Sequence, residues 1–292
     1  ISGENGTGDG VNIKVFSRTN DGGETWVPGT FNGMASTIDV RVISGVSYTN
    51  AFAIAMDTVS NAASFWKTTD GGANWSLVTG VMNTGTTTFA DGVYFWNSTK
   101  GFCYGDPVGG KFDIYYTTDG GATWTPTLAA NTPAHLDGEY GFNGAECAAK
   151  VGNGIAAFIT NKGRVYKTTD YGVTWDTTDV APFASCPYSN QIYMSSANFI
   201  IVANLPTNTS STYDWKYTTD GGATWSTYAA ASGTFYSYQL AYVPGTSNMF
   251  VATSPYSTGD KGVGYANDAL NWADFYDPIF LQSQGENMQM LG

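Results

Sequence analysis

The chain has few charged residues and no long apolar run. Only 12% of its 292 residues are Asp, Glu, Lys or Arg, and the acidic residues outnumber the basic ones by 24 to 12. A net charge of −12 cannot form the basic face that nucleic acid or an anionic membrane requires. Because no apolar stretch reaches membrane-spanning length, we expect a soluble chain that does not insert into a membrane.

Cysteine and histidine are equally scarce. The three cysteines, Cys103, Cys147 and Cys186, lack C-x-x-C spacing, which argues against a zinc site and against a dense disulfide framework. One disulfide is possible, but the spacing favours buried free thiols. The single histidine, His135, cannot complete a metal site with cysteines so placed, and no dinucleotide fingerprint or phosphate loop is present. The sequence therefore predicts neither a metal nor a cofactor.

Glycine and aromatic residues are abundant, and some of them recur in a repeated box. The letters TTDGGATW stand at 117–124 and again at 218–225, with looser copies at 19–26, 68–75 and 168–175 and a degenerate one at 265–272. The aspartate position recurs every 47 to 51 residues, at Asp21, Asp70, Asp119, Asp170, Asp220 and, in the degenerate copy, Asn267. A period of about fifty residues indicates one closed or stacked repeat domain over residues 1–292.

Each period reads as four short strands. In the third period the expected strands are 91–97, 100–106, 111–118 and 123–128, all rich in aromatic and β-branched residues and bounded by Gly, Asn, Asp or Pro. No segment has a capped apolar period of 3.6 residues, so helix content should be close to nil. Four antiparallel strands repeated six times predict an all-β, six-bladed β-propeller.

The third strand of each period is apolar on both of its faces, as a blade between two blades requires. Five residues before the box aspartate stand only apolar residues: Phe16, Phe65, Ile114, Val165 and Trp215. Before the first box there is room for one strand only, at 11–19, while residues 279–292 remain after the last. We expect the first blade to close the ring by combining N-terminal and C-terminal strands. A seventh blade is the alternative, for which the leftover residues are too few.

The box itself predicts a structural turn. Its Asp can accept backbone N–H groups across the turn, and its second Gly supplies a positive φ. The closing tryptophan should then fill the wedge between two blades; these residues are Trp26, Trp75, Trp124, Trp175, Trp225 and Trp272. A catalytic aspartate would not need near-identical copies on five blades, so we interpret the box as a feature of the fold.

The box resembles the Asp-box, or BNR repeat, of sialidases, sortilin ectodomains, xyloglucanases and propellers similar to the photosystem II assembly factor. Residues 101–124 and 138–175 further resemble secreted bacterial proteins of this group. The resemblance implies the propeller fold, whereas function varies widely within the group. A sialidase would need three converging arginines, one of them in an F/Y-R-I-P motif, and that motif is absent here. An assembly factor of the photosystem type would carry an arginine-rich face, which Arg18, Arg41 and Arg164 cannot supply.

Residues outside the boxes offer one possible site. Asp106 in YGDPVGG and the segment HLDGEYGF, which holds His135, Asp137, Glu139 and Tyr140, fall near strand ends where propellers build their sites. Asp106 and Glu139 could form the carboxylate pair of a glycoside hydrolase. The alternative, which we favour, is that Asp106 caps a turn and Glu139 satisfies local backbone donors.

The sequence thus predicts a non-catalytic binding or scaffolding module for a protein or glycan partner, with a polysaccharide hydrolase as the alternative. Low charge, acidic pI and kinship with secreted propellers favour an exported or surface-exposed bacterial protein. The chain begins at Ile1 without a visible signal peptide, as expected of a mature or trimmed form.

Overall fold

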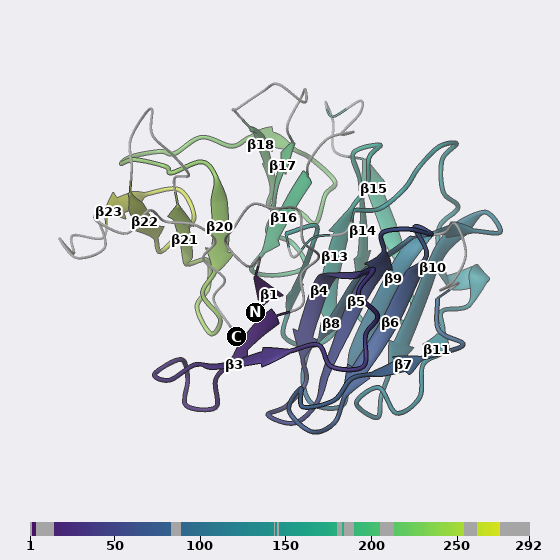
Figure 1. The fold of residues 1–292 in the computed structure, drawn as a ribbon. Coiled ribbons are helices and arrows are strands. Elements are labelled where there is room, and N and C mark those ends of the chain that lie inside the picture. Colours follow the sequence, from purple (N-terminus) through teal and green to yellow (C-terminus); the bar gives the residue numbers. More distant parts are fainter. Residues whose placement is uncertain are drawn as a thin grey trace. The chain divides into compact units, whose positions relative to one another are not determined.

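The computed structural model describes residues 2–3, 15–82, 89–142, 144, 146–179, 183, 190–204, 213–253 and 262–274. The chain divides into two compact units: residues 1–156 with 167–177, and residues 157–166 with 178–292. The described residues form six sheets, five of four strands and one of three (Figure 1). The four-stranded sheets each use four consecutive strands, so one fifty-residue period makes one blade, which confirms the all-β six-bladed propeller fold.

The first unit holds the sheets of the first three periods. The three-stranded sheet comprises β1 (Ser2–Gly3), β2 (Val15–Arg18) and β3 (Val27–Thr30). The second comprises β4 (Ile38–Gly45), β5 (Ala51–Asp57), β6 (Ala63–Thr68) and β7 (Ser76–Val78). The third comprises β8 (Ala90–Phe95), β9 (Gly101–Val108), β10 (Lys111–Thr117) and β11 (Thr125–Pro126), close to the strands expected.

The remaining strands belong to the last three periods. The fourth sheet, which the boundary between the units crosses, comprises β12 (Ala148–Val151), β13 (Ile155–Ile159), β14 (Arg164–Thr168) and β15 (Asp176–Asp179). The second unit holds β16 (Asn190–Met194), β17 (Ile200–Asn204), β18 (Asp214–Thr218) and β19 (Ser226–Thr227), then β20 (Gln239–Tyr242), β21 (Phe250–Thr253), β22 (Val263–Ala266) and β23 (Trp272–Asp274). The described residues contain no α-helix, only the 3-10 turn η1 (Ala129–Asn131).

The third strands are buried as the sequence predicts. The five apolar residues that precede each box aspartate by five positions are all at most 6% exposed. The next residue along, on the opposite face of the strand, is also buried in two blades: Tyr166 is 0% and Lys216 6% exposed. A strand buried on both faces is covered on both faces, which is the environment of a propeller blade.

The first sheet differs from expectation in one respect. The N-terminus supplies a short extra strand, β1, in which Ser2 lies opposite Phe16 of β2. From the sequence, we expect only one strand, at 11–19, before the first box. Residues 279–292 lie outside the described residues, so their contribution to the first blade stays a prediction.

The box turns have one hydrogen-bond pattern. In the third blade the Thr117 hydroxyl donates to Asp119 Oδ1 (2.8 Å) and accepts the Gly121 N–H (2.9 Å). Asp119 Oδ1 also accepts the Thr123 N–H (2.9 Å), while Oδ2 accepts the Thr123 hydroxyl (2.6 Å). The same carboxylate pattern recurs at Asp21, Asp70, Asp170 and Asp220. The Asp of the box therefore accepts donors across its turn, as predicted.

Both residues after the box aspartate have positive φ, not the second alone. Gly120 has φ of 72° and Gly121 of 79°. In the fourth box Tyr171 takes the first of these positions with φ of 66°, a conformation that costs a residue with a side chain free energy.

The degenerate box uses a different aspartate from the one expected. Alignment of the repeats placed Asn267 at the aspartate position, but Asp268 makes the turn. Asp268 Oδ1 accepts the N–H groups of Leu270 (2.9 Å) and Asn271 (2.7 Å), and Oδ2 accepts the Asn271 carboxamide (2.6 Å). The donor lies three residues after the aspartate instead of four, so this turn is one residue shorter.

Three box tryptophans, Trp75, Trp124 and Trp175, pack against aromatic rings of the preceding blade. Trp124 contacts Phe52 and Phe65 of the second sheet, with ring centroids 5.6 and 5.5 Å apart. Trp75 lies 6.0 Å from Phe16 of the first. Trp26 is the exception to the predicted wedge, because 42% of it is exposed.

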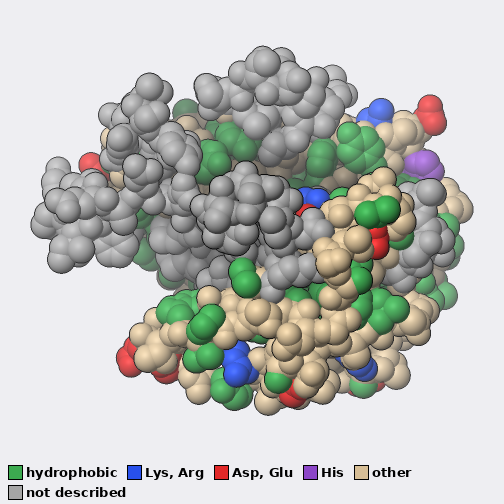
Figure 2. Space-filling view, viewed as in Figure 1, with side chains coloured by type: hydrophobic (Ala, Val, Ile, Leu, Met, Phe, Trp, Pro, Cys, Tyr) green, Lys and Arg blue, Asp and Glu red, His purple; other side chains and the backbone are tan. Residues whose placement is uncertain are grey.

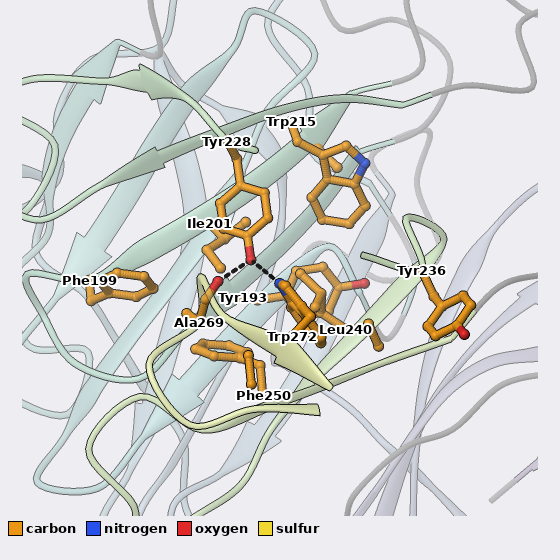
Figure 3. Close-up of a cluster of buried hydrophobic side chains, with 13 residues drawn as sticks. Tyr193, Phe199, Ile201, Trp215, Tyr228, Tyr236, Leu240, Phe250, Ala269 and Trp272 are labelled. Atoms are coloured by element: carbon orange, nitrogen blue, oxygen red, sulfur yellow. Dashed lines mark hydrogen bonds between the residues drawn. The ribbon is translucent and has the colours of Figure 1, made fainter. Parts of the chain in front are cut away.

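In the second unit an aromatic core links the fifth and sixth sheets. Tyr228 and Trp272 are each 5% exposed, and Trp272 Nε1 donates to the Tyr228 hydroxyl (3.2 Å), which in turn donates to the Ala269 carbonyl (Figure 3). Phe250 and Leu240 complete the cluster. Buried hydroxyl and indole groups thus satisfy each other inside an apolar core.

The cysteines agree with the expectation of buried free thiols as far as the structure describes them. Cys103 is a buried free thiol, and Cys147 is buried as well. Cys186 lies outside the described residues.

We predict that Gly121→Ala destabilises the fold by about 2–4 kcal/mol in urea unfolding. A Cβ at Gly121 would lie 2.2 Å from Phe52 Cζ, and Phe52 is stacked between Phe65 and Phe95. Positive φ costs Ala about 1–2 kcal/mol and overpacking about 1–3 kcal/mol. The control is Gly80→Ala, at φ of 75° with no atom within 4 Å of the new Cβ. Equal losses for both variants would contradict the packing argument.

The box carboxylates should make the fold sensitive to acid. Hydrogen bonds from the backbone of Asn74, then from the side chains of Asn74 and Thr68, lower the pKa of Asp70 to about 2. A lowered pKa stabilises the fold above the unfolded pKa of about 3.9, and this stabilisation is lost as the pH falls towards 2. Asp70→Asn should therefore be less stable than wild type at pH 6 and approach it only near pH 2 in urea midpoints. Asn74→Thr, which restores the usual donors, should follow wild type; a pH-independent difference for Asp70→Asn would contradict the prediction.

Candidate functional site

The candidate site lies at the end of the third sheet opposite its box turn. Strand β10 ends at Thr117, where the box begins, and starts at Lys111, where the hairpin from β9 enters. The segment 127–147, which leads to β12, bonds back to this hairpin end: the His135 N–H donates to the Gly110 carbonyl (3.1 Å), and Lys111 forms an isolated bridge with Ala134. The residues singled out in the sequence are therefore gathered at one end of one blade.

Asp106 stands at an irregularity of the sheet. Gly105 pairs with Asp113 and Pro107 with Phe112, so Asp106 is an extra residue between two paired positions. Such a bulge re-aims a side chain out of the regular alternation. The Asp106 N–H donates to the Phe89 carbonyl (2.8 Å), and its Oδ1 accepts the Gly141 N–H (2.9 Å). Burial raises the pKa of this carboxyl, against the effect of these hydrogen bonds.

A second carboxyl, Asp91, lies close to Asp106 and was missed in the sequence. Asp91 is also at a register shift, between Ala90 paired with Gly105 and Gly92 paired with Tyr104. It is 2% exposed, and its Oδ2 accepts no hydrogen bond. A Cβ added to Gly141 would lie 2.3 Å from this oxygen, so the loop backbone covers it directly. The sequence signal was an aspartate inside the apolar strand at 89–95.

Burial disfavours the ionised form of Asp91. Loss of solvent first, and then the charge of Asp106, raise its pKa well above the usual range. A buried carboxylate without a cation or several donors is costly, which favours the protonated acid. No three His, Cys, Asp or Glu side chains converge as a metal site among the residues that the structure describes.

Glu139 forms hydrogen bonds within the turn that it belongs to. It is 4% exposed, its Oε2 accepts the Leu136 N–H (2.7 Å), and its N–H donates to the Leu136 carbonyl (3.0 Å). This is the local backbone role that the sequence analysis favoured over catalysis. The carboxyl that the charge of Asp106 affects is instead Asp91.

The other residues of the segment lie nearer the surface. His135 Nδ1 lies 2.6 Å from the Leu136 carbonyl, and Asp137 is exposed. Tyr140 is 39% exposed and contacts Phe142, with ring centroids 5.5 Å apart. The structure thus places all four residues of this segment beside the hairpin, but with different surroundings.

Two tyrosines of the sheet, the buried Tyr104 and the half-buried Tyr94, hold the far part of the segment. The Tyr104 hydroxyl donates to the Phe142 carbonyl (3.3 Å), and the Tyr94 hydroxyl donates to the Gly144 carbonyl (3.1 Å). Burial raises the pKa of both phenols, so both remain donors at any ordinary pH. Together with the Gly141–Asp106 bond, they hold the segment at three successive points.

Each of the three arginines has a hydrogen-bond or ion-pair partner within the chain. Arg18 donates to the Gly71 carbonyl, Arg41 pairs with Asp39 (2.9 Å), and Arg164 donates to the Tyr166 hydroxyl (3.0 Å). On the face drawn in Figure 2, Lys and Arg side chains lie singly and not in a patch. No helix in the described part of the chain is long and apolar enough to cross a membrane.

Comparison with known families identifies the repeat. The family model described as "Photosynthesis system II assembly factor YCF48" matches residues 57–186, and the BNR/Asp-box repeat model matches residues 216–227. The solved structure "YCF48 bound to D1 peptide" is 18% identical, with a TM-score of 0.52, over 83% of this chain and 70% of that one. The chain is therefore an Asp-box repeat β-propeller, which confirms the resemblance inferred from the sequence.

Other solved structures are more distant in fold. The Niastella koreensis GH74 enzyme is 18% identical with a TM-score of 0.48, over 80% of this chain and 38% of that one. YCF48 from Cyanidioschyzon merolae is 13% identical with a TM-score of 0.45, over 90% and 74%. A search of curated proteins found no match. Since all identities are low, the comparisons show the fold and leave the activity open.

We predict that Asp91→Asn stabilises the fold at pH 7 and much less at pH 4. A carboxyl whose folded pKa lies far above the unfolded value of about 3.9 destabilises the fold increasingly as the pH rises above 4, by at most about 1.4 kcal/mol per pH unit. Urea unfolding at both pH values measures the difference. Asp137→Asn, which removes an exposed carboxylate of the same region, is the control. A stability gain for Asp91→Asn that does not change with pH would contradict a protonated Asp91.

Proposed function

We propose that this propeller is a non-catalytic module that binds a protein partner. The observation that carries the proposal is the way its candidate carboxylates are used. Glu139 is committed to the Leu136 N–H, and the neighbour of Asp106 is Asp91, which is 2% exposed. A glycoside hydrolase needs two carboxyl groups that both reach the scissile bond, and Asp91 cannot reach a polysaccharide.

A protein partner is supported by the relatives. The YCF48 structure of similar fold is described as bound to a D1 peptide, and the YCF48 family model covers the third and fourth periods, where the candidate site lies. A rigid propeller that displays variable loops at one end of its blades suits recognition better than chemistry. The proposal for this chain is protein binding in general, and the D1 peptide belongs to that relative.

The finer parts of the proposal concern place and ligand. Low charge, an acidic pI and the likeness of residues 101–124 and 138–175 to secreted bacterial propellers favour export or display at a cell surface. A glycan ligand is the alternative to a protein, because exposed aromatic rings such as Tyr140 can stack on sugars. Immunodetection of the protein in cell-surface and culture fractions of its host tests the location.

The function can be tested on the purified chain with two assays in parallel. A phage-displayed library of random peptides should yield sequences that bind the chain, while xyloglucan and other neutral or acidic polysaccharides should release no reducing sugar. Release of sugar that falls about a hundredfold or more in both Asp106→Asn and Glu139→Gln would establish a hydrolase and overturn the proposal. Failure to enrich any peptide, with binding to a glycan array, would replace the protein partner by a glycan.

A further inference from the structure

We propose that Phe89, Val108, Leu136 and Tyr140, together with Asp106, form a docking surface for a short extended peptide in which an apolar side chain stands next to a lysine or arginine. These five residues are called the Asp106 surface below. The inference rests on the proposed function, protein binding, and adds to it a place on the molecule and a partner chemistry.

The sheet brings two of the apolar residues to Asp106. Phe89 precedes β8, and its carbonyl accepts the Asp106 N–H (2.8 Å). Val108 ends β9, two residues after Asp106, and pairs with Lys111 across the hairpin. The bulges at Asp91 and Asp106 lie on either side of Gly105, so the irregular end of the sheet is built around this carboxyl.

The segment that follows the sheet brings the other two. Tyr140 precedes Gly141, whose N–H donates to Asp106 Oδ1 (2.9 Å). Leu136 follows His135, whose N–H donates to the Gly110 carbonyl at the hairpin (3.1 Å). These bonds thus hold the backbone at or next to each of the four apolar residues close to the hairpin end that carries Asp106, and a docking site gains affinity from such preorganisation.

The four side chains are exposed although they are large and apolar. Phe89, Val108 and Tyr140 are each 39% exposed, and Leu136 is 47% exposed. Exposed apolar side chains that stand singly are ordinary, but a group of them at one point marks an interaction site. Aromatic residues in particular are enriched in the cores of protein interfaces. The Asp106 surface has two of them, Phe89 and Tyr140.

The carboxylate of Asp106 favours a partner with a basic side chain. Neither Asp106 nor Asp91 belongs to an ion pair within the described part of the chain, and Asp91 Oδ2 accepts no hydrogen bond. A half-buried carboxylate interacts with a cation more strongly than an exposed one does, because solvent screens it less. Burial already raises the pKa of Asp106, which means that its hydrogen bonds leave the ionised form without full compensation. A lysine or arginine of the partner would supply it, and the net charge of −12 would attract such a segment.

The size of the surface indicates a peptide and not a folded domain. A stable interface between two folded proteins buries about 800 Å² on each partner, with some 20 to 30 residues a side. Four apolar side chains around one carboxyl offer much less than that, but they match a few residues of an extended chain. The partner segment therefore needs only one apolar anchor and one cation, a few residues long.

Four fluorescein-labelled peptides test the surface by fluorescence anisotropy. In one Gly-Ser background each peptide carries two copies of Leu-Lys, Leu-Glu, Ser-Lys or Ser-Glu. The Leu-Lys peptide should bind wild-type protein at least about tenfold more tightly than the other three, about 1.4 kcal/mol. Leu136→Asp and Asp106→Asn should each weaken this binding about tenfold or more. Leu77→Asp, at an equally exposed leucine (51%) on β7, is the matched control and should bind like wild type.

The outcomes separate this inference from the general function. If the Leu-Lys peptide binds wild type, Leu136→Asp and Leu77→Asp equally, the chain binds peptides at another place and only the Asp106 surface is wrong. If none of the four peptides binds while phage display yields other ligands, the partner chemistry is wrong. A dimer in analytical ultracentrifugation that Leu136→Asp disperses would assign the surface to a second copy and overturn the proposal. Far-UV circular dichroism of each variant confirms that it is folded.

Discussion

Each regular blade depends on one hydrogen-bonded turn, in which a single carboxylate holds the chain between the third and fourth strands. At Asp119 the two oxygens accept the N–H and the hydroxyl of Thr123, while Thr117 ties the start of the turn to Gly121. The turn brings Gly121 against Phe52 and Trp124 against the rings of the preceding sheet. Local hydrogen bonding and packing between blades therefore depend on the same eight residues.

The two ends of the third sheet are consequently under different constraints. At the box end, the residues form the hydrogen-bonded turn and pack against the preceding sheet. At the opposite end the backbone departs from regular pairing at two bulges, and what these bulges present differs between blades. The register shift in β8 presents the buried Asp91, whereas the corresponding shift between Val40 and Val42 in β4 presents Arg41, which pairs with Asp39 at the surface. The same kind of bulge thus carries different side chains in different blades, and such variation between loops and strand ends is typical of surfaces that bind a partner.

Part of the candidate site could be predicted from the sequence and part could not. Asp106 and the segment around Glu139 could be singled out because they lie at strand ends, outside the repeated box. Asp91 could not, because strict alternation gives no warning of a bulge, and a shift of one residue turns a side chain to the other face. The same limit applies to the degenerate box, where the turn is one residue shorter and Asp268 replaces Asn267 as the acceptor.

The sequence by itself determined the all-β fold, the number of blades, the buried third strands and the role of the box, because each follows from short-range rules repeated every fifty residues. Only the tertiary structure showed that Glu139 bonds to its own turn in place of facing Asp106, and that Asp91 lies buried beneath Gly141. The burial of Asp91 depends on a contact between residues far apart in the chain. No local pattern encodes such a contact, since it arises from a bulge and from the anchoring of a loop.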